Sequence, residues 1–183
     1  MFDKNLLKGK RILVTGGGSG LGKEMSRHFL TYGAEVIICG RRDEVLQKTA
    51  TELADETKGN ISAHSLDIRD SLAIEDTINN IFDEGPLDGL VNNAAGNFIS
   101  RTNDLSPNGF NAIASIVFHG TFNMTNTVGK KWIELNKPGT ILSITTTWVW
   151  TGSPFVVPSA MSKSGINAMT KSLACLLYTS DAA

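Results

Sequence analysis

The stretch Arg11-Ile-Leu-Val-Thr-Gly-Gly-Gly-Ser-Gly-Leu-Gly22 joins a short apolar run to a glycine cluster. The apolar run, residues 11–15, is typical of a buried strand, and residues 21–32 space their apolar side chains as one face of a helix does. A glycine turn between a strand and a helix is the arrangement that binds the pyrophosphate of a dinucleotide. A glycine cluster can also be only a flexible loop, but the strand and helix that flank this one favour the phosphate site.

The glycines of the turn have separate expected roles. Gly16 permits the tight turn, Gly20 lets backbone amides approach a pyrophosphate, and Gly22 allows the helix to pack closely on the strand. The N-terminus of the helix then points at the anion. The cofactor contacts expected in this turn are Gly16, Gly18, Ser19, Gly20, Leu21 and Gly22.

Strands and helices alternate along the rest of the chain. Apolar runs predict strands at 36–39, 61–66, 89–92 and 139–145. Helical spacing predicts helices at 43–53 with Asp43 as N-cap, at 71–82, from Ser106 and Pro107 towards Lys131, and from about Ser159 onward. Strict alternation with short links predicts one α/β domain with a doubly wound parallel sheet in three layers, α/β/α. The ligand is expected at the carboxyl ends of the strands, near the switch point.

The composition is that of one ordinary globular domain. The chain has 183 residues, of which 41% are hydrophobic, and its net charge of -1 gives no basic excess to attract nucleic acid or an anionic membrane. No apolar run has the length of a membrane-spanning helix, and the first residues lack the apolar stretch of a secretory signal. Two distant cysteines indicate neither a disulfide framework nor a zinc site. We therefore expect a cytoplasmic protein with no nucleic-acid partner, no membrane partner and no metal.

Residues after the second and third predicted strands indicate which dinucleotide is bound. An NAD site usually has an acidic residue at the end of the second strand, whereas this chain has Arg41 and Arg42 there. A guanidinium pairs with a 2′-phosphate, so NADP(H) is favoured, the alternative being two solvated surface charges. Asp67, with Ile68 beside it, is expected at the cofactor, where its carboxylate accepts from the adenine amino group. Spacing alone equally allows Asp67 to cap the next helix.

These residues resemble the short-chain dehydrogenase/reductase family. The resemblance rests on the glycine turn, Asp67, the segment Val91-Asn-Asn-Ala-Ala-Gly96 and Lys163, and it covers nearly everything from Leu7 to Ala174. It implies a Rossmann domain, a nicotinamide cofactor and hydride transfer at a carbonyl or an activated alkene. It also implies that Asn92 and Asn93 support the central strand and contact the cofactor. Lys163 would hold the nicotinamide ribose and lower the pKa of a neighbouring proton donor.

The chain departs from the family's usual catalytic set. Ser159 stands where the family has its tyrosine four residues before Lys163, and Thr146 stands at the usual serine. The position of the family's helix asparagine holds Val117. A member without catalysis would show these departures. They agree better with the 2,4-dienoyl-CoA reductase subgroup, which the segments 92–100, 105–108, 144–147 and 151–160 resemble.

The subgroup resemblance implies hydride delivery from NADPH to the distal carbon of a conjugated dienoyl thioester. It implies that Asn97 donates to the thioester oxygen and that Phe98 and Ser106 line the fatty-acyl thioester. The subgroup's tyrosine position holds Trp148, whose indole donates a hydrogen bond but releases no proton as a phenol does. Trp148 could orient the oxygen while water, Thr146 or Ser159 supplies the proton, or it could only wall an acyl pocket. A different substrate, or a lost activity, is the remaining alternative.

Residues 175–183 do not continue the resemblance. Cys175-Leu-Leu-Tyr-Thr-Ser-Asp-Ala-Ala183 resembles the translation of a sequencing adapter. We therefore expect residues 1–174 to be a partial Rossmann domain, incomplete at its C-terminal edge, and residues 175–183 to be an artefactual tail without a role for Cys175 or Tyr178. The alternative is a genuine short protein. If the chain is a fragment, it is expected to be inactive, and the functional assignments describe its longer parent.

The leading hypothesis is an NADPH-dependent reductase of 2,4-dienoyl-CoA or related enoyl thioesters in fatty-acid β-oxidation. Its partners would be an acyl-CoA substrate and, since the family usually forms tetramers through its two long central helices, further copies of itself. A short-chain dehydrogenase acting on a ketone or alcohol is one alternative. A non-catalytic NADP-binding member is the other.

Overall fold

The computed structural model describes residues 2–180, and the side chains of residues 2–174. Five parallel strands form one sheet in the order β3-β2-β1-β4-β5. The strands are β1 (Arg11–Thr15), β2 (Glu35–Gly40), β3 (Ile61–Ser65), β4 (Gly89–Asn92) and β5 (Thr140–Ser143). The chain runs outward in one direction from β1 to β3 and in the other from β4 to β5, so the switch point lies between β1 and β4. This confirms the predicted doubly wound sheet, with β5 as its outermost described strand on one side.

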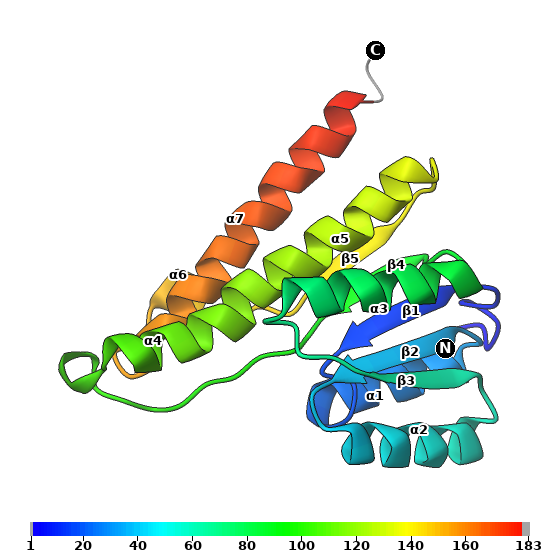
Figure 1. Ribbon diagram of the computed structural model, residues 1–183, viewed down its shortest axis with the longest axis horizontal. Helices are drawn as coiled ribbons and strands as arrows, with labels where there is room; N and C mark the ends of the chain where they lie inside the picture. Colours follow the sequence, from blue (N-terminus) through cyan, green and yellow to red (C-terminus); the bar gives the residue numbers. More distant parts are fainter. Residues whose placement is uncertain (1, 181–183) are drawn as a thin grey trace.

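Helices cover both faces of the sheet (Figure 1). They are α1 (Gly20–Thr31), α2 (Asp43–Thr57), α3 (Ser71–Glu84), α4 (Pro107–Ala114), α5 (Thr121–Glu134), α6 (Trp148–Thr151) and α7 (Val157–Ser180), with a 3-10 turn η1 (Thr102–Asp104) and a π-helical segment η2 (Ser115–Gly120). In Figure 1 α4, η2 and α5 form one continuous rod beside α7. The long helix predicted from Ser106 towards Lys131 is therefore present, and it carries a π-helical turn that the periodicity did not predict.

The core follows the alternation of side chains along the strands. Leu13 and Ile37 point to the face covered by α3 and α5, whereas Val14 and Ile38 point to the face covered by α1 and α2. All four side chains are fully buried. Because burying an aliphatic side chain contributes about 1.5–3 kcal/mol, continuous apolar strands require helices on both sides of the sheet.

A small cluster joins α7 to the long rod. Ile166 of α7 packs against Ile113 and Val117. A Cβ at Gly165 would collide with the ring of Phe118, so the glycine allows α7 to lie close to η2. This packing fixes the part of α7 that reaches the carboxyl ends of the strands.

The helix caps differ in one place from the prediction. Ser106 is the N-cap of α4, and its hydroxyl oxygen accepts a hydrogen bond from the N–H of Gly109 at 3.1 Å, as expected. Asp43 was predicted to be the N-cap of α2, and this is wrong. Arg42 occupies the N-cap without a side-chain bond, and Asp43 is the first residue of the helix. There its carboxylate stabilises the positive end of the helix dipole instead.

The described residues also bear on the expectations about membrane spans, metal ligands and cysteines. Within residues 2–180 no helix has both the length and the apolar character needed to cross a membrane. The described side chains include no group of three or more His, Cys, Asp and Glu residues that could hold a metal ion. Burial raises the pKa of the Cys39 thiol to about 12. The side chains of Cys175 and Tyr178 lie outside the described ones, and the expected boundary at residue 174 stays a prediction.

Candidate active site

A cleft of about 460 Å³ opens at the carboxyl ends of the strands. Residues that follow each of the five strands line it, among them Gly16 after β1, Asn93 after β4 and Ile144 after β5. This is the place where the doubly wound topology predicts a ligand. Nine of the expected cofactor residues line the cleft: Gly16, Gly18, Ser19, Leu21, Arg41, Asp67, Ile68, Asn93 and Lys163.

The glycine turn has the conformation that its sequence predicts. Gly16 and Gly20 have φ angles of 66° and 54°, in the left-handed region that favours glycine. A Cβ at Gly22 would lie 2.7 Å from the Nδ2 of Asn93 and would overlap the backbone oxygen of Gly16. Gly22 therefore allows the start of α1 to approach the turn and the end of β4.

Side chains of β1 and of the segment after β4 hold the turn. The Nδ2 of Asn93 donates to the backbone oxygens of Thr15 at 3.0 Å and Gly16 at 3.3 Å. The hydroxyl oxygen of Thr15 accepts from the N–H groups of Asn93 and Ala94, both at 3.0 Å. These four bonds tie the glycine turn to the segment that the family resemblance assigns to the central strand and the cofactor.

The turn presents donors without partners. Among the described residues no acceptor takes the N–H groups of residues 18–22, and Ser19, the N-cap of α1, makes no side-chain cap bond. Orphan N–H groups at a helix N-terminus form an anion site. The residues present therefore fit the pyrophosphate of a dinucleotide.

Charged side chains at the other wall of the cleft, two arginines and one aspartate, are accessible to solvent. Arg41 and Arg42 are exposed and line the cleft where β2 ends. The carboxylate of Asp67 pairs with the Nε of Arg69 at 2.9 and 3.0 Å, and this bond lowers the pKa of Asp67 despite partial burial. Asp67 thus remains a charged acceptor at the cleft.

The alternative role for Asp67, a helix cap, is wrong. The N-cap of α3 is Asp70, whose carboxylate accepts from the N–H groups of Leu72 at 3.0 Å and Ala73 at 3.1 Å. Asp67 lies three residues before that cap, and its carboxylate bonds only to Arg69 among the described residues. Its place in the cleft agrees with the expected cofactor contact.

Lys163 enters the cleft from α7 and is 6% exposed. Its ammonium group donates to the backbone oxygen of Ile144, whose own N–H donates to the backbone oxygen of Asn92 at 3.0 Å. Burial lowers the pKa of Lys163. Ser159 lies one helical turn earlier on α7 and is also buried, so these two side chains lie on the same face of the helix.

The other asparagine of the pair, Asn92, braces neighbouring elements. Its Nδ2 donates to the hydroxyl of Thr125 on α5 at 2.9 Å and to that of Ser143 on β5 at 3.4 Å. Its Oδ1 is buried without a partner among the described residues. The expected support of the central strand is therefore visible at Asn92, and contact with the cleft is made by Asn93.

The residues expected at the substrate do not line the cleft. Asn97 is exposed, and because its Oδ1 accepts from the N–H of Phe98 at 3.0 Å, its amide nitrogen faces away from that bond. Phe98 and Ser106 lie together, since a Cβ at Gly109 would be 3.2 Å from the Phe98 ring and 3.3 Å from the Ser106 hydroxyl. The hydroxyl of Ser106 serves as the cap of α4.

Trp148 and Thr146 belong to the segment after β5. Trp148 is the first residue of α6, and both side chains are half-buried. This segment is tied to the loop that carries Asn97, because the N–H of Ser100 donates to the backbone oxygen of Phe155 and the Thr102 hydroxyl donates to that of Pro154, each at 3.0 Å. The structure thus joins the two segments expected at the substrate. The catalytic roles of these residues stay predictions.

Sequence reasoning missed several residues of the cleft, namely Ala94, Ala95, Ile116, Ile144 and Thr145. Ile116 comes from the π-helical segment, where a Cβ at Gly120 would lie 2.7 Å from the side chain of Ile68. Gly120 was the available signal, since a glycine within a helix often marks a close approach.

Comparisons of the sequence with known proteins identify the family and similar proteins. The family model for short chain dehydrogenases matches residues 10–181. The chain is 47% identical over 171 residues to a probable 2,4-dienoyl-CoA reductase 3 of Caenorhabditis elegans, covering 92% of this chain and 55% of that protein. It is 35% identical over 182 residues to a peroxisomal 2,4-dienoyl-CoA reductase of Arabidopsis thaliana, covering 94% of this chain and 60% of that protein.

A solved structure shares the fold. The crystal structure of a short chain dehydrogenase from Bacillus anthracis superimposes with a TM-score of 0.87 at 41% identity, over 91% of this chain and 69% of that one. Compared with the two curated relatives named above, the chain spans about half of their length.

Proposed function

The chain belongs to the short-chain dehydrogenase family, and on this premise we propose that it forms the cofactor-binding part of an NADPH-dependent reductase of 2,4-dienoyl-CoA or related enoyl thioesters. One observation carries the cofactor part of the proposal. The glycine turn, Arg41 and Lys163, which are far apart in the sequence, line one cleft. They supply amides for a pyrophosphate, a guanidinium for a 2′-phosphate and an ammonium group for ribose hydroxyls.

The preference for NADPH rests on the charges at the end of β2. Among the described residues that line the cleft, Asp67 is the only acidic one, and it follows β3 rather than β2. Since no carboxylate lines the described cleft after β2, none there would repel a 2′-phosphate, and Arg41 and Arg42 would attract it.

The dienoyl thioester is supported by the relatives' names and by Asn97. When bound, the nicotinamide supplies the hydride. The Oδ1 of Asn97 accepts from Phe98, which leaves its NH₂ group to donate to the thioester oxygen where negative charge develops. Lys163 holds the ribose and adds a positive charge beside the site. Trp148 donates through its indole, and Thr146 or Ser159 passes a proton from water.

A specific observation favours the second candidate, an NADP-binding member without catalysis. Ser159 and Trp148 stand at the two positions where the family and the subgroup have tyrosines, so the described chain brings no phenol to the site. The phosphate-binding half needs neither residue. Cofactor binding without turnover would support this candidate.

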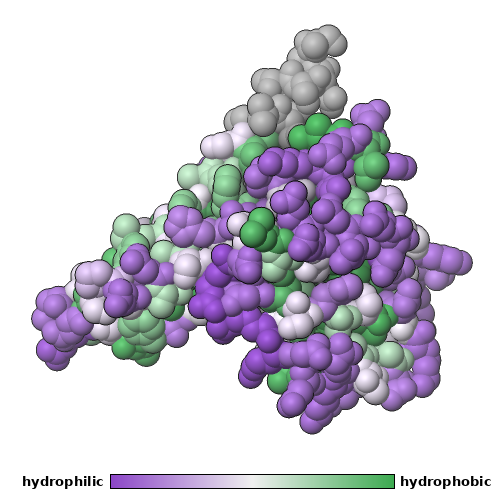
Figure 2. All heavy atoms as spheres, in the orientation of Figure 1, coloured by the Kyte–Doolittle hydropathy of each residue, from purple (hydrophilic) through white to green (hydrophobic). Residues whose placement is uncertain are grey.

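The assembly proposed for the parent is a homotetramer. Phe118, Phe122 and Ile133 on the η2–α5 rod and Met161 on α7 are large exposed hydrophobic residues. Figure 2 shows hydrophobic residues gathered along the arm that holds the long helices, while much of the rest of that view is hydrophilic. Such a surface is typical of a protein interface. A role in β-oxidation is part of the same proposal, and the cytoplasmic location stays a prediction, since one of the relatives is named as peroxisomal.

Calorimetry and turnover test the proposal together. The chain is titrated with NADPH and with NADH, and tighter binding of NADPH is expected. Reduction of a 2,4-dienoyl-CoA is then measured against a simple ketone, with the chain and, where the gene continues beyond residue 174, with the longer product. Preference for NADH contradicts the cofactor assignment, and turnover of the ketone alone contradicts the thioester.

A further inference from the structure

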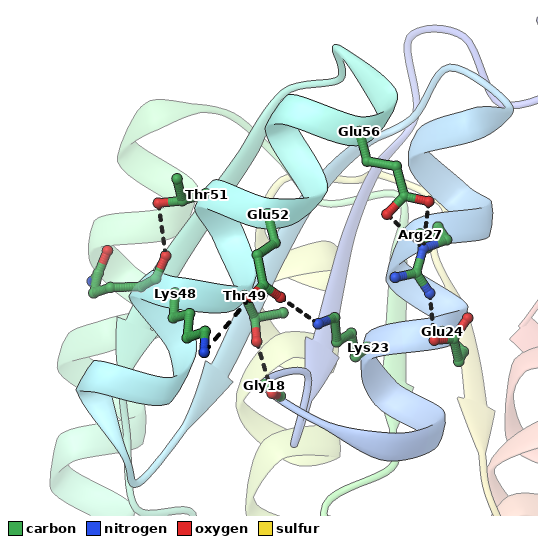
Figure 3. Close-up of polar contacts among 10 residues, drawn as sticks. Gly18, Lys23, Glu24, Arg27, Lys48, Thr49, Thr51, Glu52 and Glu56 are labelled. Carbon is green, nitrogen blue, oxygen red and sulfur yellow. Dashed lines mark hydrogen bonds and ion pairs between the residues drawn. The ribbon is translucent and has the colours of Figure 1, made fainter.

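A partly buried hydrogen bond joins helix α2 to the glycine turn. Thr49 lies on α2 and is 3% exposed, and its hydroxyl donates to the backbone oxygen of Gly18 at 2.8 Å (Figure 3). The contact spans 31 residues of sequence. Leu46 packs beside it, since a Cβ at Gly18 would lie 3.2 Å from the Leu46 Cδ2. A Cβ at Gly18 would also lie 3.4 Å from the Val45 Cγ1, so helix α2 touches the turn through one hydrogen bond and two apolar side chains.

The bond sets the orientation of the peptide between Gly18 and Ser19. Residues 2–180 contain no cis peptide bond, and in a planar trans peptide the C=O and the following N–H point in opposite directions. Because Thr49 holds the carbonyl of Gly18 on the α2 side, the N–H of Ser19 points away from α2. Ser19 and Gly18 both line the cleft.

Side chains from two elements thus hold the carbonyls of the turn. Asn93, after β4, binds the oxygen of Gly16, and Thr49, on α2, binds the oxygen of Gly18. Carbonyl oxygens directed at an anion would repel it, whereas the N–H groups of residues 18–22 have no acceptor among the described residues. The turn can bind phosphate only while its carbonyls are held outward.

The neighbouring ion pairs do not replace this bond. Lys23 pairs with Glu52 at 2.6 Å and Arg27 with Glu56 at 2.9 Å between α1 and α2, as Figure 3 shows. These side chains are partly exposed, so salt screens them and they contribute little. They join the helices to each other, and the Lys23 and Arg27 side chains donate only to glutamates among the described residues, not to the backbone of the turn.

We propose that Thr49 is a positioning residue of the phosphate-binding turn, whose hydroxyl turns the Gly18 carbonyl away from the pyrophosphate so that the Ser19 N–H faces it. The proposal rests on the proposed dinucleotide function. It concerns one end of the cleft only. Arg41 and Asp67, which line the cleft after β2 and β3, would bind the adenosine end, and Thr49 bonds to neither of them.

The test compares two ligands on matched variants. Thr49→Val removes the hydroxyl and keeps the shape. Thr49→Ser keeps the hydroxyl. Thr51→Val is the control on the same helix, since the Thr51 hydroxyl donates to the backbone oxygen of Gln47 and not to the turn. NADPH binding is measured by calorimetry, and binding of adenosine 2′-monophosphate, which has no pyrophosphate, by ligand-observed NMR.

Thr49→Val is expected to raise the Kd for NADPH at least fivefold and to change that for adenosine 2′-monophosphate less than twofold. Thr49→Ser and Thr51→Val should bind both ligands as the unmutated chain does. Equal weakening of both ligands, or an unchanged Kd for NADPH, overturns the proposal. If Thr49→Val does not fold, Thr49→Ala replaces it, and weakened NADPH binding by a folded Thr49→Ser overturns the proposal by itself. An unmutated chain that binds no dinucleotide overturns the proposed function as well.

Discussion

The ammonium group of Lys163 donates a hydrogen bond to the backbone oxygen of Ile144, so helix α7 is joined to the end of β5 inside the cleft. The amine is buried, and its burial lowers its pKa. Burying a charged group with one neutral acceptor opposes folding. We therefore infer that the buried ammonium group of Lys163 serves to bind a ligand and does not stabilise the unliganded fold.

Lys163→Met is expected to weaken NADPH binding at least tenfold and to remove a pH dependence of stability. The folded pKa of Lys163 lies below the unfolded value of about 10.4. Between these two values the unfolded state binds more protons, so the free energy of unfolding of the unmutated chain rises with pH relative to that of the variant. Urea unfolding of both proteins from pH 7 to pH 10.5 measures this difference. A constant difference over that range contradicts the prediction.

Gly22→Ala should lower both the stability and the affinity for NADPH. Alanine has the higher helix propensity, by about 1 kcal/mol, but its Cβ would lie 2.7 Å from the Asn93 Nδ2 and overlap the Gly16 oxygen. We expect a net loss of about 1–3 kcal/mol. Gly129→Ala on α5 is the control, because open space surrounds that position, and it should gain about 0.5–1 kcal/mol. Thermal unfolding of both variants decides, and a stabilised Gly22→Ala would refute the steric argument.

Arg41→Asp should reverse the cofactor preference. The variant places a carboxylate after β2, where it would repel a 2′-phosphate and accept from ribose hydroxyls. We expect the Kd for NADPH to rise at least tenfold and that for NADH to fall. Lys48→Asp makes the same change of charge on an exposed side chain of α2 and should leave the ratio of the two Kd values unchanged. A ratio that moves equally in both variants would mean that only the overall charge matters.

The two aspartates near the start of α3 should separate stability from binding. Asp70→Ala removes the cap of α3 and is expected to lower the free energy of unfolding by about 1 kcal/mol without changing NADPH affinity. Asp67→Ala should weaken NADPH binding while lowering stability less. Urea unfolding and calorimetry on each variant measure both quantities. If Asp70→Ala loses affinity for NADPH but keeps its full stability, the cofactor contact belongs to Asp70 and not to Asp67.

The sequence predicted the elements whose signals are local. Strands β1 and β4 have the predicted bounds, because short apolar runs there end at Thr15 and Asn92 beside turn residues. The π-helical segment was not predictable, since one extra residue in a helical turn changes the apolar spacing too little to be noticed. The cap of α2 was misplaced by one residue because the type of Asp43 favours an N-cap, whereas the backbone becomes helical already at Asp43 and leaves Arg42 in the extended cap conformation.

The site could be predicted in part for the same reason. Its glycine turn, Arg41, Asp67 and Lys163 have recognisable types and spacing, and the structure brings them into one cleft. The bond between Thr49 and Gly18 had no local signal, because the two residues belong to different elements that meet only after folding. The oxygen of Ile144 is a backbone atom, so no residue type reveals that it binds Lys163.

Asn97→Ala is expected to reduce turnover of a 2,4-dienoyl-CoA by about a hundredfold or more while NADPH affinity changes less than twofold. The reason is that its amide would act on an oxygen whose charge develops only during the reaction, and such donors typically contribute about 10²–10³ in rate. Asn103→Ala is the control in the same loop, where the exposed amide donates to Asp104 and to no other described residue. Turnover is measured with the chain or the longer product, whichever reduces the thioester.

Trp148→Tyr completes this test, because it restores a phenol at the position where the subgroup has its tyrosine. An indole donates a hydrogen bond but releases no proton, whereas a phenol does both. If protonation limits the rate, Trp148→Tyr should raise turnover, and Trp148→Phe, which removes the donor, should lower it. Equal rates for all three side chains would leave Trp148 as a wall of the acyl pocket. If Asn97→Ala also retains full turnover, the dienoyl assignment of this loop is wrong.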